Sequence, residues 1–104
     1  MKIEVYVTIE DIENGCNDAG VYSSCPIARA LLRLDCEKVD ADEDRILLTW
    51  KNNRYVFKTP RTAALFIDDF DHDREVKPIN FVLEKPKLAT PEDERQPIMG
   101  TKFD

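Results

Sequence analysis

Two short runs rich in apolar residues, 45–51 and 54–58, constrain the fold of this chain most strongly. The two runs are separated by Asn52-Asn53, and asparagine tolerates the positive φ angles of a two-residue hairpin turn. The spacing therefore predicts a β-hairpin. A turn at these asparagines puts the large apolar side chains on one face, with the pairs Trp50 and Tyr55, Leu48 and Phe57, and Ile46 and Thr59.

Strand patterns also occur near both ends of the chain. Residues 2–9 alternate apolar and polar side chains, which predicts a first strand with one buried face. Residues 79–83 predict a last strand, and Pro78 before it favours the first position of a strand or a sheet edge. The inward side chains of this last strand are Ile79, Phe81 and Leu83.

Two segments between the first strand and the hairpin carry helix signals. Residues 10–15 predict a single helical turn, which Gly15 would end in a left-handed conformation. Pro26 marks the start of a helix of about ten residues, with Ser23 or Ser24 as its cap. Its expected core face consists of Ile27, Ala30, Leu31 and Leu34.

The order of the elements predicts the fold class. Thr59-Pro60 repeats the pattern of a cap followed by proline and predicts another helix, and apolar residues at helical spacing continue it to about Asp71. Residues 1–84 then read β-α-β-β-α-β, a single α+β domain. Right-handed crossovers arrange this order as a ferredoxin-like two-layer sandwich, with an antiparallel sheet and two helices on one face. A different α+β arrangement of the same elements stays open.

The remaining residues, 85–104, differ in composition from the rest of the chain. They contain three prolines, many charges and few large apolar side chains. Such a segment buries too little apolar surface to offset the entropy of ordering it. The sequence therefore predicts an extended or flexible tail.

Charge and composition exclude several classes of function. The chain has 104 residues and a formal net charge of -6, which disfavours a general attraction to nucleic acid or anionic membranes. Its apolar runs are too short for a membrane span, and its opening residues do not resemble a signal peptide. Three cysteines, an odd number, are most simply reduced thiols. We therefore expect a cytoplasmic protein, in the host cytoplasm if a phage encodes it.

Catalytic and metal-binding signals are weak. Cys25 stands at a helix start, where a thiol can become nucleophilic, but the chain has one histidine, His72, and it lies among aspartates. We expect Cys25 to be a small packed residue. Cys16, Cys25, Cys36 and His72 lack the close pairs of a structural zinc site. We expect no enzyme activity, no catalytic residues, no metal and no cofactor.

Charged residues are strongly segregated along the chain. Residues 45–61 hold five basic side chains and no acid, whereas 35–44 hold six acids and 68–75 hold five. One interpretation is solubility with protection of sheet edges. The other is an acidic surface that occupies a basic groove of a partner protein, with Asp68, Asp69 and Asp71 as candidate contacts. An alternative function is nucleic-acid binding by the hairpin bases Lys51, Arg54, Lys58 and Arg61.

The face of the sheet away from the helices gives a second candidate surface. Under the predicted fold it carries several apolar side chains, and such patches often mark contacts with a partner or a second copy. Its expected members are Tyr6, Leu47, Thr49, Val56 and Val82. RNA-binding sheets expose two or three stacking aromatics, whereas this face has one, Tyr6. A protein partner or self-association fits this surface better than RNA.

Several strings resemble a group of small uncharacterised proteins from bacteriophages, prophages and bacteria. The most specific is Cys-Pro-Ile-Ala-x-Ala-Leu at residues 25–31, accompanied by Glu-Asp-Ile-Glu-Asn-Gly at 10–15 and Tyr-x-Phe-x-Thr-Pro at 55–60. The resemblance covers about residues 3–84. It carries no functional residues, but it implies a phage-type accessory protein. Such proteins often bind and block host machinery, such as a defence or nucleic-acid-handling enzyme.

Overall fold

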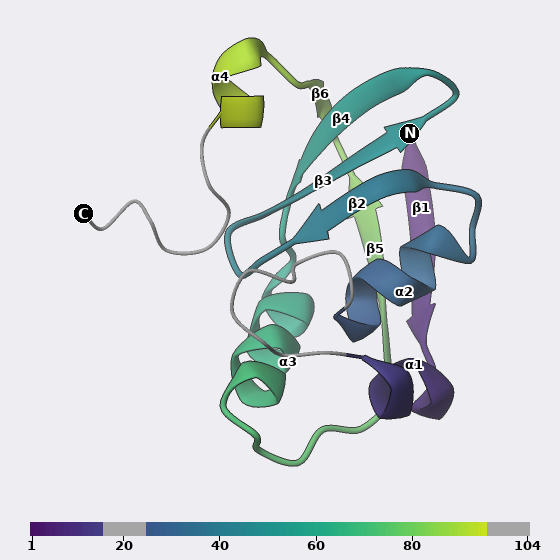
Figure 1. Cartoon of the computed structure of the whole chain (residues 1–104), viewed down its shortest axis with the longest axis vertical. Coiled ribbons are helices and arrows are strands. Elements are labelled where there is room, and N and C mark those ends of the chain that lie inside the picture. Colours follow the sequence, from purple (N-terminus) through teal and green to yellow (C-terminus); the bar gives the residue numbers. More distant parts are fainter. Residues whose placement is uncertain (16–24, 96–104) are drawn as a thin grey trace.

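A computed structural model of the chain describes residues 1–15 and 25–95, and these form an α+β fold (Figure 1). The predicted class is therefore confirmed. Helices α1 to α3 gather at the end of the molecule opposite α4. The elements in chain order are β1 (Lys2–Val7), α1 (Ile9–Asn14), α2 (Pro26–Leu32), β2 (Glu37–Ala41), β3 (Arg45–Trp50), β4 (Asn53–Lys58), α3 (Arg61–Asp71), β5 (Ile79–Glu84), β6 (Lys87–Leu88) and α4 (Pro91–Arg95).

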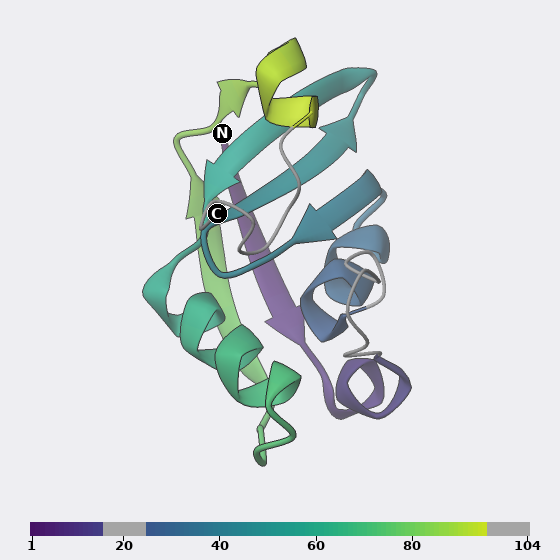
Figure 2. The same ribbon diagram turned by 60° about the vertical axis from the view of Figure 1, so that its left-hand side comes forward.

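The strands form two antiparallel sheets, so the predicted ferredoxin-like sandwich with one sheet is not confirmed. One sheet has the order β1-β5 and the other has the order β2-β3-β4-β6. The chain passes from one sheet to the other after β5, because it turns at Lys85, where φ is 59°, and continues as β6 beside β4 (Figure 2). Strand β2, which pairs with β3, has no counterpart in the predicted order. The 40–44 segment was expected to be only a polar break.

The hairpin is confirmed, but its predicted register is wrong by two residues. The turn lies at Lys51-Asn52, with φ angles of 51° and 70°, rather than at the two asparagines. Ile46 therefore pairs with Phe57, and Leu48 pairs with Tyr55. Side chains alternate between faces with a period of two, so a shift of two leaves the same residues on the inner face. The apolar pattern cannot distinguish the two registers.

Helix α1 begins and ends by contacts that differ from the prediction. Thr8 caps it, since its hydroxyl accepts the Asp11 N–H at 3.2 Å and the Asp11 carboxylate accepts the Thr8 N–H at 2.9 Å. Gly15 follows the helix with φ of -78°, which is an extended conformation and not a left-handed stop. A Cβ atom at Gly15 would lie 2.7 Å from Cδ of Pro26. Close packing against Pro26 therefore requires this glycine.

The caps of α2 and α3 also differ from the prediction. The Cys25 sulfur accepts the Ala28 N–H at 3.5 Å and caps α2, while residues 23 and 24 lie outside the described part of the chain. Because α2 ends at Leu32, Leu34 is 42% exposed and does not join the core. Thr59 does not cap α3, which begins after Pro60. The Thr59 hydroxyl is buried and donates instead to the Asp42 carbonyl in the turn between β2 and β3.

The main hydrophobic core joins both sheets to α2 and α3. Its fully buried side chains come from both sheets and from the helices, and they include Val5, Ile27, Leu31, Ile46, Leu48, Phe57 and Leu83. A second, smaller cluster lies on the other face of the hairpin, where Leu47 and Val56 pack against Ala89. The first part of the predicted tail, residues 85–95, thus belongs to the fold. Residues 96–104 lie beyond the described part.

Asp11 and Arg33 connect the first helices to β1. The Arg33 guanidinium donates to the Asp11 carboxylate at 2.5 Å and to the Tyr6 carbonyl at 2.9 Å. Burial acts to raise the pKa of Asp11, but the hydrogen bonds from Arg33 and the Thr8 backbone outweigh it and lower that pKa. The carboxylate therefore stabilises the folded state in its charged form.

We expect Asp11→Ala to lower the free energy of unfolding by about 2 kcal/mol at pH 7, because a cap and a charged hydrogen bond are lost together. The pKa of Asp11 is lower in the folded state than its unfolded value of about 3.9. Its contribution is therefore present above that value and is lost as the pH falls through the folded pKa. Urea unfolding from pH 7 to pH 2.5 measures both effects. Glu13→Ala, at an exposed site on the same helix, serves as the control. Equal free energies of unfolding for the wild type and Asp11→Ala at pH 7 would contradict the expectation.

Candidate interaction surface

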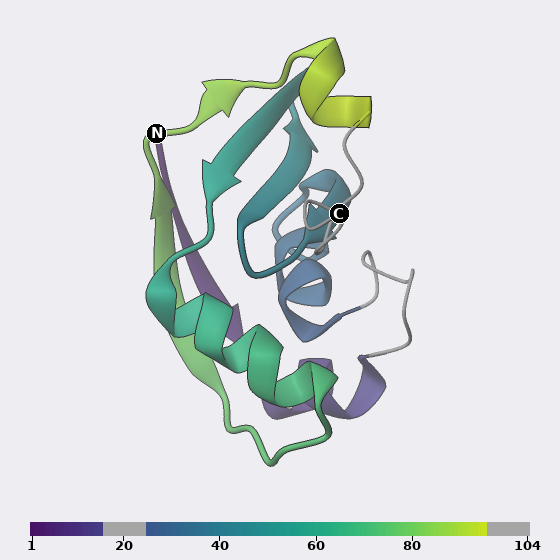
Figure 3. The same cartoon turned by 90° about the vertical axis from the view of Figure 1, so that its left-hand side faces the viewer.

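Acidic residues from two separate segments meet beside α3. The turn between β2 and β3 lies next to this helix in all three views (Figures 1 to 3). Burial raises the pKa of Glu43, and repulsion from Asp68, Asp71 and Asp44 raises it further. We call Glu43, Asp44, Asp68 and Asp71 the acidic edge. The sequence prediction included two of these four residues and treated the two acidic segments as separate.

Hydrogen bonds hold the turn that carries Glu43. The Asp42 carboxylate accepts the backbone N–H groups of Asp44 at 2.8 Å and Arg45 at 2.9 Å. Thr59 donates its hydroxyl to the Asp42 carbonyl at 2.8 Å and its N–H to the Asp44 carbonyl at 3.2 Å. Asp42 is only 4% exposed, so its side chain has a structural role. Glu43, in contrast, is exposed to solvent.

The acids of α3 have different local partners. Arg74 contacts the carboxylates of Asp68 at 2.5 Å and Asp69 at 2.8 Å, and His72 lies 3.3 Å from Asp68. Burial raises the pKa of Asp71, and Asp68 adds to this effect while His72 opposes it. Asp71 and Glu43 are thus the acids of the edge whose pKa values rise through burial and like charge. Asp68 and Asp69 are partly compensated by Arg74.

The predicted outward face of the sheet is divided and partly covered. Tyr6 and Val82 are 53% and 39% exposed, on β1 and β5. Leu47 and Val56 lie on β3 and β4 and face away from the main core, but with 2% and 8% exposure they are buried and not open to solvent as expected. The physical reason is that residues 85–95 fold over this face and place Ala89 against it. Thr49 is half-buried beside this covered region.

The basic residues of the hairpin have unequal environments. Arg54 donates to the Lys38 carbonyl and contacts the Asp40 carboxylate at 3.2 Å. The Lys51 ammonium lies 4.6 Å from the Trp50 ring centroid. Lys51, Lys58 and Arg61 are exposed, whereas Arg54 is half-buried. The four side chains of the alternative nucleic-acid surface therefore do not form one uniformly available patch.

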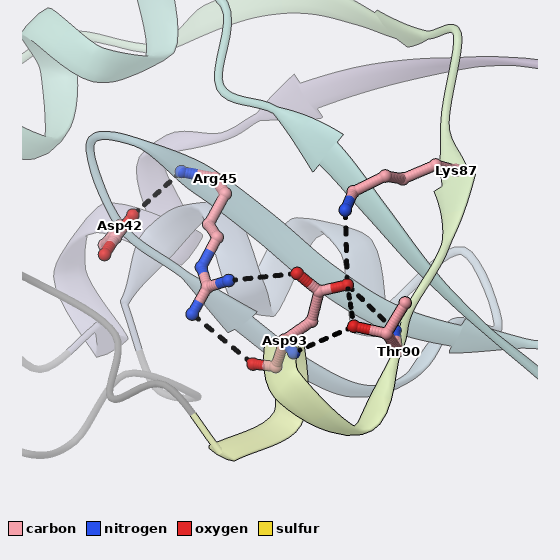
Figure 4. A network of polar contacts seen from close by, with 5 residues as sticks. All are labelled: Asp42, Arg45, Lys87, Thr90 and Asp93. Atoms are coloured by element: carbon pink, nitrogen blue, oxygen red, sulfur yellow. Dashed lines mark hydrogen bonds and ion pairs between the residues drawn. The ribbon is translucent and has the colours of Figure 1, made fainter.

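A polar network fastens the C-terminal segment to the hairpin (Figure 4). The Arg45 guanidinium contacts the Asp93 carboxylate at 3.5 Å and the Asp93 carbonyl at 3.4 Å. Lys87 approaches the same carboxylate at 3.3 Å. The Thr90 N–H donates to Asp93 at 2.8 Å, and this bond, together with the Thr90 hydroxyl and Lys87, lowers the pKa of Asp93. This network holds Ala89 over Leu47 and Val56.

The two described cysteines lie in the interior. Cys25 and Cys36 are buried free thiols, and burial raises the pKa of both. His72 is exposed at the end of α3. Within residues 1–15 and 25–95, no group of three or more histidine, cysteine or acidic side chains is arranged to hold a metal ion. Cys16 lies outside these ranges.

The comparisons with known proteins identify no relative. No family model matches the chain, and neither the curated proteins nor the solved structures provide a match. Within the described residues, no helix has both the length and the apolar character needed to cross a membrane. The surface described above is therefore the basis for the functional proposal.

Replacing Glu43 by glutamine should raise the free energy of unfolding at pH 7. The pKa of Glu43 is higher in the folded state, so its charge disfavours folding at neutral pH, and this cost disappears below the unfolded pKa of about 4.3. Solvent screening at this exposed position keeps the gain to about 0.5 kcal/mol or less. Chemical unfolding at pH 7 and pH 3 measures it, with Glu37→Gln on β2 as the control. A loss of stability at pH 7 would contradict crowding by like charges.

Substitution of Asp93 tests the attachment of the C-terminal segment. Asp93→Ala removes the contacts to Arg45, Lys87 and Thr90, so we expect faster hydrogen exchange at the Ala89 N–H, which bonds to the Arg54 carbonyl at 2.9 Å. Exchange measured by NMR should increase at this amide and remain unchanged in β1. Glu92→Ala, at the neighbouring exposed acid, is the control. Unchanged protection at Ala89 would show that the polar network is not what holds the segment.

Proposed function

We propose that this protein is a non-enzymatic binding protein whose acidic edge docks against a basic surface of another protein. The observation that carries the proposal is the convergence of Glu43, Asp68 and Asp71 on one rigid support, with a raised pKa at Glu43. Like charges held close together disfavour the folded state. A basic partner offsets this cost, because its positive charges attract the carboxylates that repel one another in the free protein.

The rigidity of the edge supports the same function. Its acids are carried by a helix and by a turn with internal hydrogen bonds, so little conformational entropy is lost when a partner binds. A charged surface of this kind also speeds the encounter with an oppositely charged protein. Both effects favour recognition through charge and shape.

The resemblance to phage-type accessory proteins indicates which class of partner to propose. Enzymes that handle nucleic acid contact phosphates through lysine and arginine side chains, so their grooves offer basic surfaces. An acidic protein that fills such a groove competes with the nucleic acid. We therefore propose an inhibitor of a host defence or nucleic-acid-handling enzyme, acting in the cytoplasm.

Direct nucleic-acid binding by the hairpin is the alternative and has less support. Arg54 already contacts Asp40, and Arg45 already contacts Asp93. Of the proposed contacts, Lys51, Lys58 and Arg61 are exposed, and Lys51 lies over the Trp50 ring. A gel-shift titration at low salt, with binding that weakens as salt rises, would favour this alternative.

The acidic edge can be tested by charge reversal in a binding experiment. Immobilised wild-type protein and a Glu43→Lys/Asp71→Lys variant are incubated with nuclease-treated bacterial lysate, and retained proteins are identified by mass spectrometry. We expect a partner that the wild type retains and that the variant retains at least about tenfold less, because attraction becomes repulsion.

A matched control separates the surface from the net charge. Glu13→Lys/Glu37→Lys changes the net charge equally at exposed positions on α1 and β2. This control should retain the partner as well as wild type does. Equal retention by the Glu43→Lys/Asp71→Lys variant would contradict the proposal.

A further inference from the structure

A groove runs along the flank of α3 that faces residues 75–79. Its volume is about 400 Å³, and its lining residues are Thr62, Leu65, Phe66, Asp69, Glu75, Val76, Lys77 and Ile79. Leu65 is 53% exposed, so its side chain is accessible from solvent. Four of the lining residues are apolar and three are charged, which is a composition suited to an apolar group with polar surroundings.

Helix α3 places this groove next to the acidic edge. Leu65 and Asp69 are four residues apart and share the groove flank, whereas Asp68 and Asp71 are three apart and share the other flank. A protein lying across α3 therefore contacts both features. The predicted surfaces did not include this groove, because the segment 75–79 reaches it only through the tertiary fold.

We propose that the groove receives an apolar side chain of the same basic partner, flanked on that partner by lysine or arginine. This inference rests on the proposed function and adds the position at which an apolar side chain of the partner binds. Charge complementarity favours a basic partner, because the groove lining holds two acids, Asp69 and Glu75, against one base, Lys77, and α3 carries Asp68 and Asp71 beside Glu43. The volume suits one or two side chains rather than a whole helix.

The arrangement follows the pattern of strong protein contacts. Most binding energy in an interface comes from a few anchors in well-packed pockets, and the charged rim contributes orientation and encounter rate. In this protein Leu65, Val76 and Ile79 would surround the anchor. The acidic edge would align the basic residues on either side of it.

Two synthetic peptides test the groove separately from the edge. One has phenylalanine between two pairs of lysines, and the other has serine in place of the phenylalanine. NMR titration of isotope-labelled protein follows the methyl groups of Leu65, Val76 and Ile79 and the amides of Glu43 and Asp71. We expect the phenylalanine peptide to shift both sets and to bind about fivefold more tightly than the serine peptide, which should shift the acidic edge alone.

A variant and the possible outcomes complete the experiment. Leu65→Ala should remove the fivefold difference between the peptides, whereas Leu32→Ala, at another exposed leucine on α2, should preserve it. Shifts at the edge without shifts at the groove methyl groups would overturn this inference and leave the proposed function standing. Absence of shifts at the edge with either peptide would count against the proposed function itself. Groove shifts produced by concentrating the protein alone would identify a second copy as the occupant and overturn the inference.

Discussion

Two hydrogen bonds from Thr59 determine where the acidic edge lies. Its hydroxyl binds the Asp42 carbonyl and its N–H binds the Asp44 carbonyl, so the residue before α3 is tied to the turn between β2 and β3. Thr59 is 6% exposed, and buried polar groups must be paired, so both bonds are required by the fold. Because the tie is made at the start of α3, the helix runs past the turn and brings its own acids near Glu43.

A second constraint is the bend at Lys85, which brings residues 85–95 over the predicted outward face of the hairpin. After the bend the chain pairs with β4 and continues into α4, which Arg45 holds through Asp93. This segment covers Leu47 and Val56, which would otherwise be exposed apolar side chains on the hairpin. The fold therefore covers the hairpin part of the predicted outward face, whereas Tyr6 and Val82 stay exposed.

Short-range patterns predicted β1, the hairpin, the first three helices and β5, but not β2, β6 or α4. The two apolar runs and the asparagines between them identified the hairpin, but they could not choose between registers that differ by two residues. Proline signals located the starts of α2 and α3, yet Cys25 replaced the expected serine cap, and Thr59 bonded to a distant turn. The predicted tail failed as a uniform segment because Tyr55 and Val56 offer an edge with which Leu88 and Lys87 pair.

The sequence alone determined the α+β class, the hairpin and the segregation of charge, because periodicity and local charge are properties of neighbouring residues. Only the tertiary structure decided that Glu43 lies near Asp71, that Leu47 is covered and that a groove forms between α3 and residues 75–79. The first two features join residues far apart in the chain, and the groove depends on how the chain folds back after α3. Their positions depend on strand partners and bends whose energies no local pattern contains.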